Sequence, residues 1–192
     1  MSTSTAPLGP VLIVGTGLIG TSIGLSLRRA GVEVLLDDIV PGQAIVAREL
    51  GAGNLLTEGA QPRIVVVSVP PRHAASTLAR VSSDFPDAVI TDVTSVKAVV
   101  LRDAISQGAD PRRLVGGHPM AGREVSGATA ARVYLLDDRL WIITPGEASG
   151  ESLEAVSRMV AACGALATEM TPEEHDRAVA LDSHAPQVLS SV

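Results

Sequence analysis

Short apolar runs alternate with amphipathic stretches along most of this chain, and the alternation predicts strands and helices in turn. Residues 11–14 are all apolar and lead into a glycine-rich turn, after which leucine and isoleucine recur at near-helical spacing until Gly31. A short continuous apolar run is typical of a buried strand, and the spacing that follows is typical of a helix packed by one face. The chain is therefore predicted to begin with a strand, a tight turn and a helix.

The same alternation continues to about residue 170. Further strands are expected at 32–36, 64–69, 88–93, 141–144 and 166–170, and helices at 41–50, at 73–81, between Lys97 and about Gln107, and at 151–163. Residues 116–122 hold three glycines and are expected to form a loop. Strands that alternate with helices at these lengths predict an α/β fold, a doubly wound parallel sheet with right-handed crossovers.

The glycine-rich turn has the spacing that binds a dinucleotide in such a sheet. Gly15 permits the tight turn, Gly17 lets the backbone approach a pyrophosphate, and Gly20 allows the helix to pack close to the strand. The helix also offers free N–H groups and the positive end of its dipole to the phosphates. The candidate cofactor residues of this Rossmann-type dinucleotide-binding domain are Gly15, Thr16, Gly17, Leu18, Ile19 and Gly20.

A carboxylate follows the second predicted strand, where such a sheet binds the ribose of the cofactor. Asp38 lies 18 residues after Gly20, and a carboxylate there accepts a hydrogen bond from the 2′-hydroxyl and repels a 2′-phosphate. The sequence therefore predicts NAD rather than NADP as the cofactor. The alternative is that Asp37 and Asp38 are only the polar end of a strand.

Candidate site residues follow other predicted strands. Because the carboxyl ends of parallel strands meet at one edge of a sheet, where ligands bind, we expect these residues to lie together. They are Ser68, Val69, Pro70 and Thr94 for the cofactor, and Ser95 and His118 for the chemistry. An imidazole held at a strand end can exchange a proton with a hydroxyl, and with an ordinary histidine pKa the activity would rise through pH of about 6 to 7. Ser95 could instead be only a helix cap.

Composition and capping divide the chain into three parts. Residues 1–9 are rich in Ser, Thr and Pro and are expected to be a disordered tail. Residues 10–170 would form the NAD-binding domain. A capping box at residues 171–174 opens a helix that runs to Val192 without a stop signal. Residues 171–192 are therefore expected to begin a helical second domain that is truncated in this chain.

Composition and charge limit the possible partners. The 192 residues are 46% hydrophobic with one Phe, one Tyr and one Trp, so aliphatic side chains must fill the core, as suits a parallel sheet covered by helices. A net charge of −6 without Lys/Arg clusters argues against nucleic acid or an anionic membrane. Without a membrane-spanning run or a signal peptide, a cytoplasmic location is expected. The single Cys163 is expected in the core, and no metal site is predicted.

Four segments together resemble the prephenate/arogenate dehydrogenase family, the oxidative branch of tyrosine biosynthesis. They are GTGLIGTSIGLSLRRAG from Gly15, DVTSVK from Asp92, GGHPMAGREVSG from Gly116 and HDRAVALDSHAPQ from His175. They occur in the order of the family and span nearly the whole chain. The glycine fingerprint is shared by many dehydrogenases, whereas GGHPMAG with a downstream Ser-His-x-Pro is far more specific.

The resemblance implies an oxidative decarboxylation, in which hydride passes from C4 of a cyclohexadiene ring to NAD, CO2 leaves and the ring becomes aromatic. His118 would accept the hydrogen bond of the C4 hydroxyl, and Ser95 would support the same hydroxyl. Glu124 would be the polar gate of the pocket, and His184 would face the substrate. Gln187 would also be a substrate-binding residue, where many members have a second histidine, and glutamine can donate a hydrogen bond but cannot carry charge.

Several alternatives remain at the level of the sequence. Prephenate and arogenate differ only in a keto or an amino group, and nothing in the chain separates these small-molecule substrates. The homodimer of the family forms through a helical C-terminal domain, most of which would lie beyond Val192. A ketopantoate reductase or a 3-hydroxyacid dehydrogenase shares the glycine turn but lacks GGHPMAG. A different class of protein, a non-catalytic NAD-binding regulatory module, would bind the nucleotide without turnover.

Overall fold

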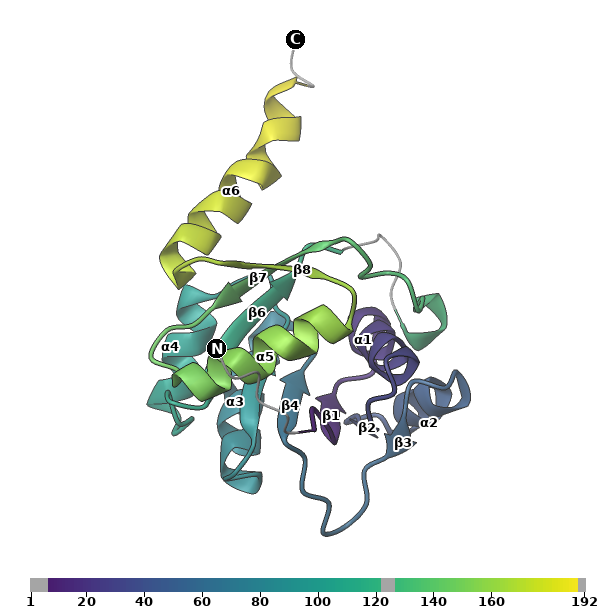
Figure 1. Ribbon diagram of the computed structural model, residues 1–192. Helices are drawn as coiled ribbons and strands as arrows, with labels where there is room; N and C mark the ends of the chain where they lie inside the picture. Colours follow the sequence, from purple (N-terminus) through teal and green to yellow (C-terminus); the bar gives the residue numbers. More distant parts are fainter. Residues whose placement is uncertain (1–6, 122–126, 190–192) are drawn as a thin grey trace.

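The computed structural model describes residues 7–121 and 127–189, the last eight of these by their backbone alone. A single sheet is covered by helices on both faces (Figure 1). The strands are β1 (Val11–Val14), β2 (Val34–Asp37), β3 (Asn54–Leu55), β4 (Ile64–Val67), β5 (Val89–Asp92), β6 (Leu114–Pro119), β7 (Leu140–Thr144) and β8 (Leu166–Glu169). The helices are α1 (Leu18–Arg29), α2 (Pro41–Glu49), α3 (Pro71–Asp84), α4 (Ala98–Ser106), α5 (Gly150–Ala162) and α6 (Pro172–Leu189), with a short 3₁₀ helix η1 (Ala128–Ala130).

The strand order confirms the doubly wound α/β fold. The eight strands run in the order β3-β2-β1-β4-β5-β6-β7-β8, and the first six are parallel to one another. The chain enters at β1, moves to one edge through β2 and β3, and then returns through β4 to build the other half. The order reverses between β1 and β4, and ligands of such sheets bind beyond the carboxyl ends of the strands at this point.

The expectation of a fully parallel sheet was wrong for β7 and β8. β7 pairs with β6 in the antiparallel direction, and β8 is parallel to β7. A parallel neighbour needs a crossover that carries the chain back along the sheet. In the described part of the connection between β6 and β7, the only helix is η1, so the chain enters β7 from the same end at which it left β6.

The expectation of a glycine-rich loop at residues 116–122 was also wrong for residues 116–119, because β6 extends through Pro119, and Gly122 lies outside the described residues. A Cβ on Gly116 would lie 2.1 Å from Thr144 Oγ1, and one on Gly117 would lie 2.7 Å from the backbone oxygen of Asp92. These two glycines therefore allow close packing within the sheet. They do not mark a turn, although glycine in a strand interior normally weakens it.

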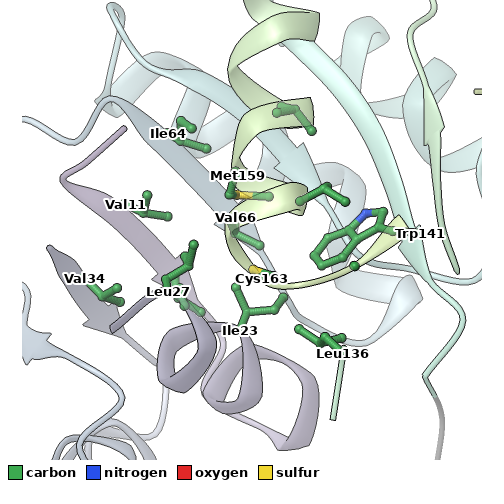
Figure 2. Packing of buried hydrophobic residues seen from close by; sticks show 14 of the residues in the cluster. Val11, Ile23, Leu27, Val34, Ile64, Val66, Leu136, Trp141, Met159 and Cys163 are labelled. Atoms are coloured by element: carbon green, nitrogen blue, oxygen red, sulfur yellow. The ribbon is translucent and has the colours of Figure 1, made fainter. Parts of the chain in front are cut away.

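Buried aliphatic side chains form one cluster on each face of the sheet. On one face, α1 and α5 pack with Trp141 over β1 and β4, as Figure 2 shows for Ile23, Leu27 and Met159. On the other face, α3 and α4 contribute residues such as Leu78 and Leu101. Cys163 is fully buried in the first cluster, and burial raises the pKa of its thiol to about 12, which confirms it as a core residue and not a nucleophile.

Helix α6 leaves the body of the molecule. Its first turns contact α4 and β7, and its far end extends away from the sheet (Figure 1). The capping box at its start is confirmed, because Glu174 Oε2 accepts a hydrogen bond from Thr171 N at 2.9 Å and Glu174 N donates to Thr171 Oγ1 at 3.2 Å. In the described ranges, no helix is long and apolar enough to cross a membrane.

Candidate active site

A pocket of about 570 Å³ opens at the carboxyl ends of the central strands. Its walls come from the turn after β1, the segment after β4, the segment after β5 and the end of β6. Nine of the residues singled out in the sequence lie in these walls: Gly17, Leu18, Ile19, Ser68, Val69, Pro70, Thr94, Ser95 and His118. The fold thus brings together residues that are up to a hundred positions apart in the chain.

The glycine turn leaves room for a phosphate group. Gly15 has a φ of +98°, and a Cβ there would lie 2.3 Å from the backbone oxygen of Ser68. A Cβ on Gly20 would lie 2.0 Å from the backbone oxygen of Gly15, whereas nothing stands within 4 Å of one on Gly17. No side chain caps the start of α1, and its first turn holds no acidic residue. The free N–H groups of this helix therefore face an open and electropositive space that suits a pyrophosphate.

Asp38 lies beside this turn, after the end of β2. Its Oδ2 accepts hydrogen bonds from Thr16 N at 2.7 Å and from Thr16 Oγ1 at 2.9 Å, and its Oδ1 accepts one from Val40 N at 2.9 Å. These bonds fix the direction of the carboxylate while leaving it partly exposed. Asp38 is thus held next to the glycine turn, where the ribose of a bound dinucleotide would lie.

A buried ion pair supports the strand end that carries His118. The ammonium group of Lys97 is paired with the carboxylate of Asp92, and both side chains are fully buried. Lys97 Nζ also donates to Thr94 Oγ1 at 3.0 Å and to the backbone oxygen of Gly117 at 2.7 Å. Asp92 Oδ1 accepts from Gly117 N at 3.2 Å. Burial lowers the pKa of Lys97, an effect opposed by the charge of Asp92. The pair therefore holds the peptide groups on both sides of Gly117, directly before His118.

His118 is held by a second histidine. His118 Nδ1 lies 2.9 Å from His175 Nε2, and the two rings meet edge to face at 69° with centroids 5.1 Å apart. Burial lowers the pKa of His118 to about 4, assisted by the nearby His175 and Lys97. The pKa range of about 6 to 7 expected from the sequence was therefore wrong, because that range assumed a solvated side chain. His118 is neutral at physiological pH and can accept a proton.

The alternative role of Ser95 as a helix cap was wrong. The residue at the N-cap position of α4 is Lys97, whose side chain makes no capping hydrogen bond, and Ser95 is exposed on the pocket wall. The first N–H groups of α4 are satisfied by α6 instead, because Asp176 accepts from Lys97 N at 2.9 Å and from Ala98 N at 3.0 Å. The Ser95 hydroxyl is thus available to a ligand in the pocket.

Three predicted site residues cannot be placed in the pocket. Glu124 lies outside the described residues. His184 and Gln187 belong to the last part of α6, residues 182–189, where only the backbone is described. Within residues 7–121 and 127–181, no group of three or more His, Cys, Asp and Glu side chains could hold a metal ion.

Four residues that hold His118 or the strand end before it were not predicted from the sequence: Asp92, Lys97, His175 and Asp176. They lie within the DVTSVK and HDRAVALDSHAPQ segments, but local spacing assigns no task to them. Their functions depend on contacts between β5, β6 and α6, which are distant in the chain. The one signal in the sequence was a pair of opposite charges close to the end of a predicted strand, Asp92 and Lys97.

Comparison with known proteins identifies the family. The model of the nucleotide-binding domain of prephenate dehydrogenase matches residues 23–169. The chain belongs to the prephenate dehydrogenase family. A probable prephenate dehydrogenase, NovF, from Streptomyces niveus is 41% identical over 92% of this chain and 49% of its own length. The prephenate dehydrogenase of Bacillus subtilis is 31% identical over 94% of this chain and 52% of its own length. The chain therefore spans about half the length of these curated relatives.

Solved structures of family members share the fold. Prephenate dehydrogenase from A. aeolicus in complex with hydroxyphenyl propionate and NAD+ superposes with a TM-score of 0.81 at 32% identity, covering 90% of this chain and 63% of that one. Arogenate dehydrogenase from Synechocystis gives a TM-score of 0.82 at 28% identity, covering 92% and 64%. This chain thus carries the nucleotide-binding domain of the family.

Proposed function

We propose that this chain is the nucleotide-binding and catalytic part of an NAD-dependent prephenate dehydrogenase of tyrosine biosynthesis. The reaction would convert prephenate and NAD+ into 4-hydroxyphenylpyruvate, CO2 and NADH. The observation that carries the proposal is the neutral His118 on the wall of the pocket, which the glycine turn and Ser95 also line. A module that only binds a nucleotide has no need of such a base.

The residues around the pocket fit NAD. The N–H groups at the start of α1 would bind the pyrophosphate, with Gly17 allowing its close approach. Asp38 would accept the hydrogen bond of a ribose hydroxyl. Residues 68–70 and Thr94 would surround the nicotinamide half. When bound, NAD supplies the hydride acceptor, so the protein has to orient the substrate and manage one proton.

His118 would accept this proton and later return it. Its unprotonated nitrogen accepts the proton of the C4 hydroxyl as hydride leaves C4, and Ser95 holds the same hydroxyl in place. The C4–O bond becomes a carbonyl, the bond from C1 to the carboxylate breaks, and the electron pair of that bond makes the ring aromatic as CO2 departs. His118 then returns the proton to the phenolate oxygen, so the base is regenerated in each turnover.

Arogenate is the second candidate substrate. The arogenate dehydrogenase of Synechocystis is similar to this chain over 92% of this chain. The side chains that would contact the keto or amino group of the substrate would belong to α6 and to the domain that follows it. We assign Glu124, His184 and Gln187 to substrate binding on the basis of the family resemblance. Glutamine at position 187 would donate a hydrogen bond to the substrate without adding a charge.

We also propose a second, helical domain for this protein. Residues 171–192 would begin a helical domain that completes the substrate pocket and forms a homodimer. The length of the curated relatives supports this, because about half of each lies outside the match. A biosynthetic enzyme of this kind would act in the cytoplasm.

Formation of NADH by the full-length protein tests the proposal. The protein would be supplied with NAD or NADP and with prephenate or arogenate, and both the absorbance of NADH and the release of CO2 would be followed. We expect turnover of prephenate with NAD, with one CO2 released for each NADH formed. Turnover of arogenate alone would replace the substrate, and binding of NAD without turnover of either compound would refute the enzymatic function.

A further inference from the structure

The contact between His118 and His175 extends to a carboxylate on the same helix. His175 Nδ1 lies 2.8 Å from Asp176 Oδ1, while His175 Nε2 lies 2.9 Å from His118 Nδ1. The ring of His175 is fully buried, so water does not compete for either nitrogen. The three side chains form a continuous chain of hydrogen bonds from α6 to the end of β6.

The direction of each hydrogen bond in this chain follows from the carboxylate. Burial alone would raise the pKa of Asp176, but hydrogen bonds from Lys97, His175 and Ala98 bring it below its usual value, so the group is ionised and can only accept. A neutral His175 therefore carries its proton on Nδ1, which leaves Nε2 as an acceptor. His118 must then donate from Nδ1, and its Nε2 is the nitrogen without a proton.

We propose that His175 and Asp176 are positioning residues that fix His118 in the tautomer whose Nε2 is the free base. This inference rests on the proposed function, because it names what orients the base in that reaction. The opposite arrangement places a proton on His175 Nε2 and leaves the bare Nδ1 facing the carboxylate of Asp176, so that two acceptors repel each other. With a neutral His175, the chain of hydrogen bonds therefore selects this one tautomer, whereas a doubly protonated His175 would donate from Nε2 and leave the proton of His118 on Nε2.

Helix α6 carries both His175 and Asp176, and Asp176 also holds this helix against α4. The carboxylate that orients His175 also accepts the N–H groups of Lys97 and Ala98 at the start of α4. Docking of α6 on α4 and orientation of the base therefore depend on one side chain. We infer that the active site extends into α6 as far back as its first turn, independently of any contact that His184 or Gln187 makes.

Two substitutions of His175 separate its effect on the orientation of His118 from its effect on the folding of the protein. Phenylalanine keeps a ring of similar size but cannot accept a hydrogen bond, so in His175→Phe the proton of His118 is free to move to Nε2. Glutamine can still accept from His118 Nδ1 through its amide oxygen. Because His73 is exposed on α3, His73→Gln serves as the matched control for His175→Gln.

The kinetic experiment compares these variants in the full-length protein. We expect His175→Phe to lower kcat by about 10- to 100-fold, because a misoriented base loses its alignment with the hydroxyl. KM for NAD and for the substrate should stay within about threefold. His175→Gln should lose less than His175→Phe, and His73→Gln should match the parent protein. A loss in His175→Gln equal to that in His175→Phe would overturn the proposal.

The second readout does not depend on activity. With ¹⁵N-labelled histidine, nitrogen shifts and couplings distinguish the two neutral tautomers, and the signal of His118 is assigned by its loss in His118→Asn. We expect Nδ1–H in the parent protein and in His175→Gln, and a shift toward Nε2–H in His175→Phe. Finding Nε2–H in the parent protein would overturn the inference, even if His175→Phe did not fold. Failure of the proposed function would appear separately, as absence of NADH formation by the parent protein.

Discussion

At the scale of single residues, burial decides how His118 can act. Removing the imidazole from water favours its neutral form, and the neighbouring His175 and Lys97 add to this effect, whereas Asp92 and Asp176 oppose it. The ammonium of Lys97 is itself paired with Asp92. The net result is a base that stays unprotonated well below neutral pH.

The first prediction concerns the pH dependence of kcat/KM. Because a lowered pKa keeps His118 unprotonated as the pH falls, activity should stay level between about pH 6 and 7 and decline only as the pH approaches about 4. The measurement is the initial rate of NADH formation at limiting substrate concentration. A decline centred between pH 6 and 7 would mean that His118 is more exposed to solvent than in this structure, or that another group is the base.

The second prediction concerns the choice of cofactor. Asp38→Asn removes the negative charge beside the glycine turn, so repulsion of a 2′-phosphate should fall. We expect the preference for NAD over NADP, measured as the ratio of dissociation constants, to drop by about tenfold, equivalent to about 1.4 kcal/mol. The matched control is Asp37→Asn, one position earlier. An unchanged ratio in Asp38→Asn would place the ribose elsewhere.

At the scale of elements, the sequence predicted six of the eight strands and missed β3 and β6. Continuous apolar runs marked β1 and β4, because strands buried on both faces need no polar residue. β6 was missed because Gly116 and Gly117 resemble a turn, and the side chains and backbone that require them to be small belong to residues 15 or more positions away. The direction of β7 was missed because pairing direction depends on the path of the connection, which local patterns do not encode.

The same limit applies to the site. The positions of Ser68, Ser95 and His118 followed from the rule that ligands bind at the carboxyl ends of parallel strands. The contacts of His118 with His175 did not, because they join β6 to α6 across 57 positions of the chain. Local sequence therefore predicts the glycine turn and the strand ends, but it does not predict the buried environment that lowers the pKa of His118.

The third prediction tests the reason for glycine in β6. Gly116→Ala would place a Cβ against Thr144 Oγ1 and Leu101, and we expect it to lower the free energy of unfolding by about 1–3 kcal/mol. The matched control is Gly42→Ala in α2, where nothing lies within 4 Å of the added Cβ. There we expect stabilisation by about 0.5–1 kcal/mol. Chemical denaturation measures both, and equal effects would contradict the packing argument.

At the scale of the whole molecule, the residues that we propose for cofactor binding and for proton transfer lie in different parts of one sheet. The glycine turn and Asp38 belong to the half that begins at β1, whereas His118 comes from β6 and depends on α6. The pocket lies between them. Damage to the second part should therefore stop the chemistry and leave dinucleotide binding intact.

The most direct test of this account is His118→Asn in the full-length protein, with kcat for NADH formation and the dissociation constant for NAD measured on the same sample. We expect kcat to fall by about 10²- to 10⁴-fold, as for the loss of a positioned base, while the dissociation constant for NAD changes by less than about twofold. Turnover equal to that of the parent protein would remove His118 from the mechanism and contradict the account.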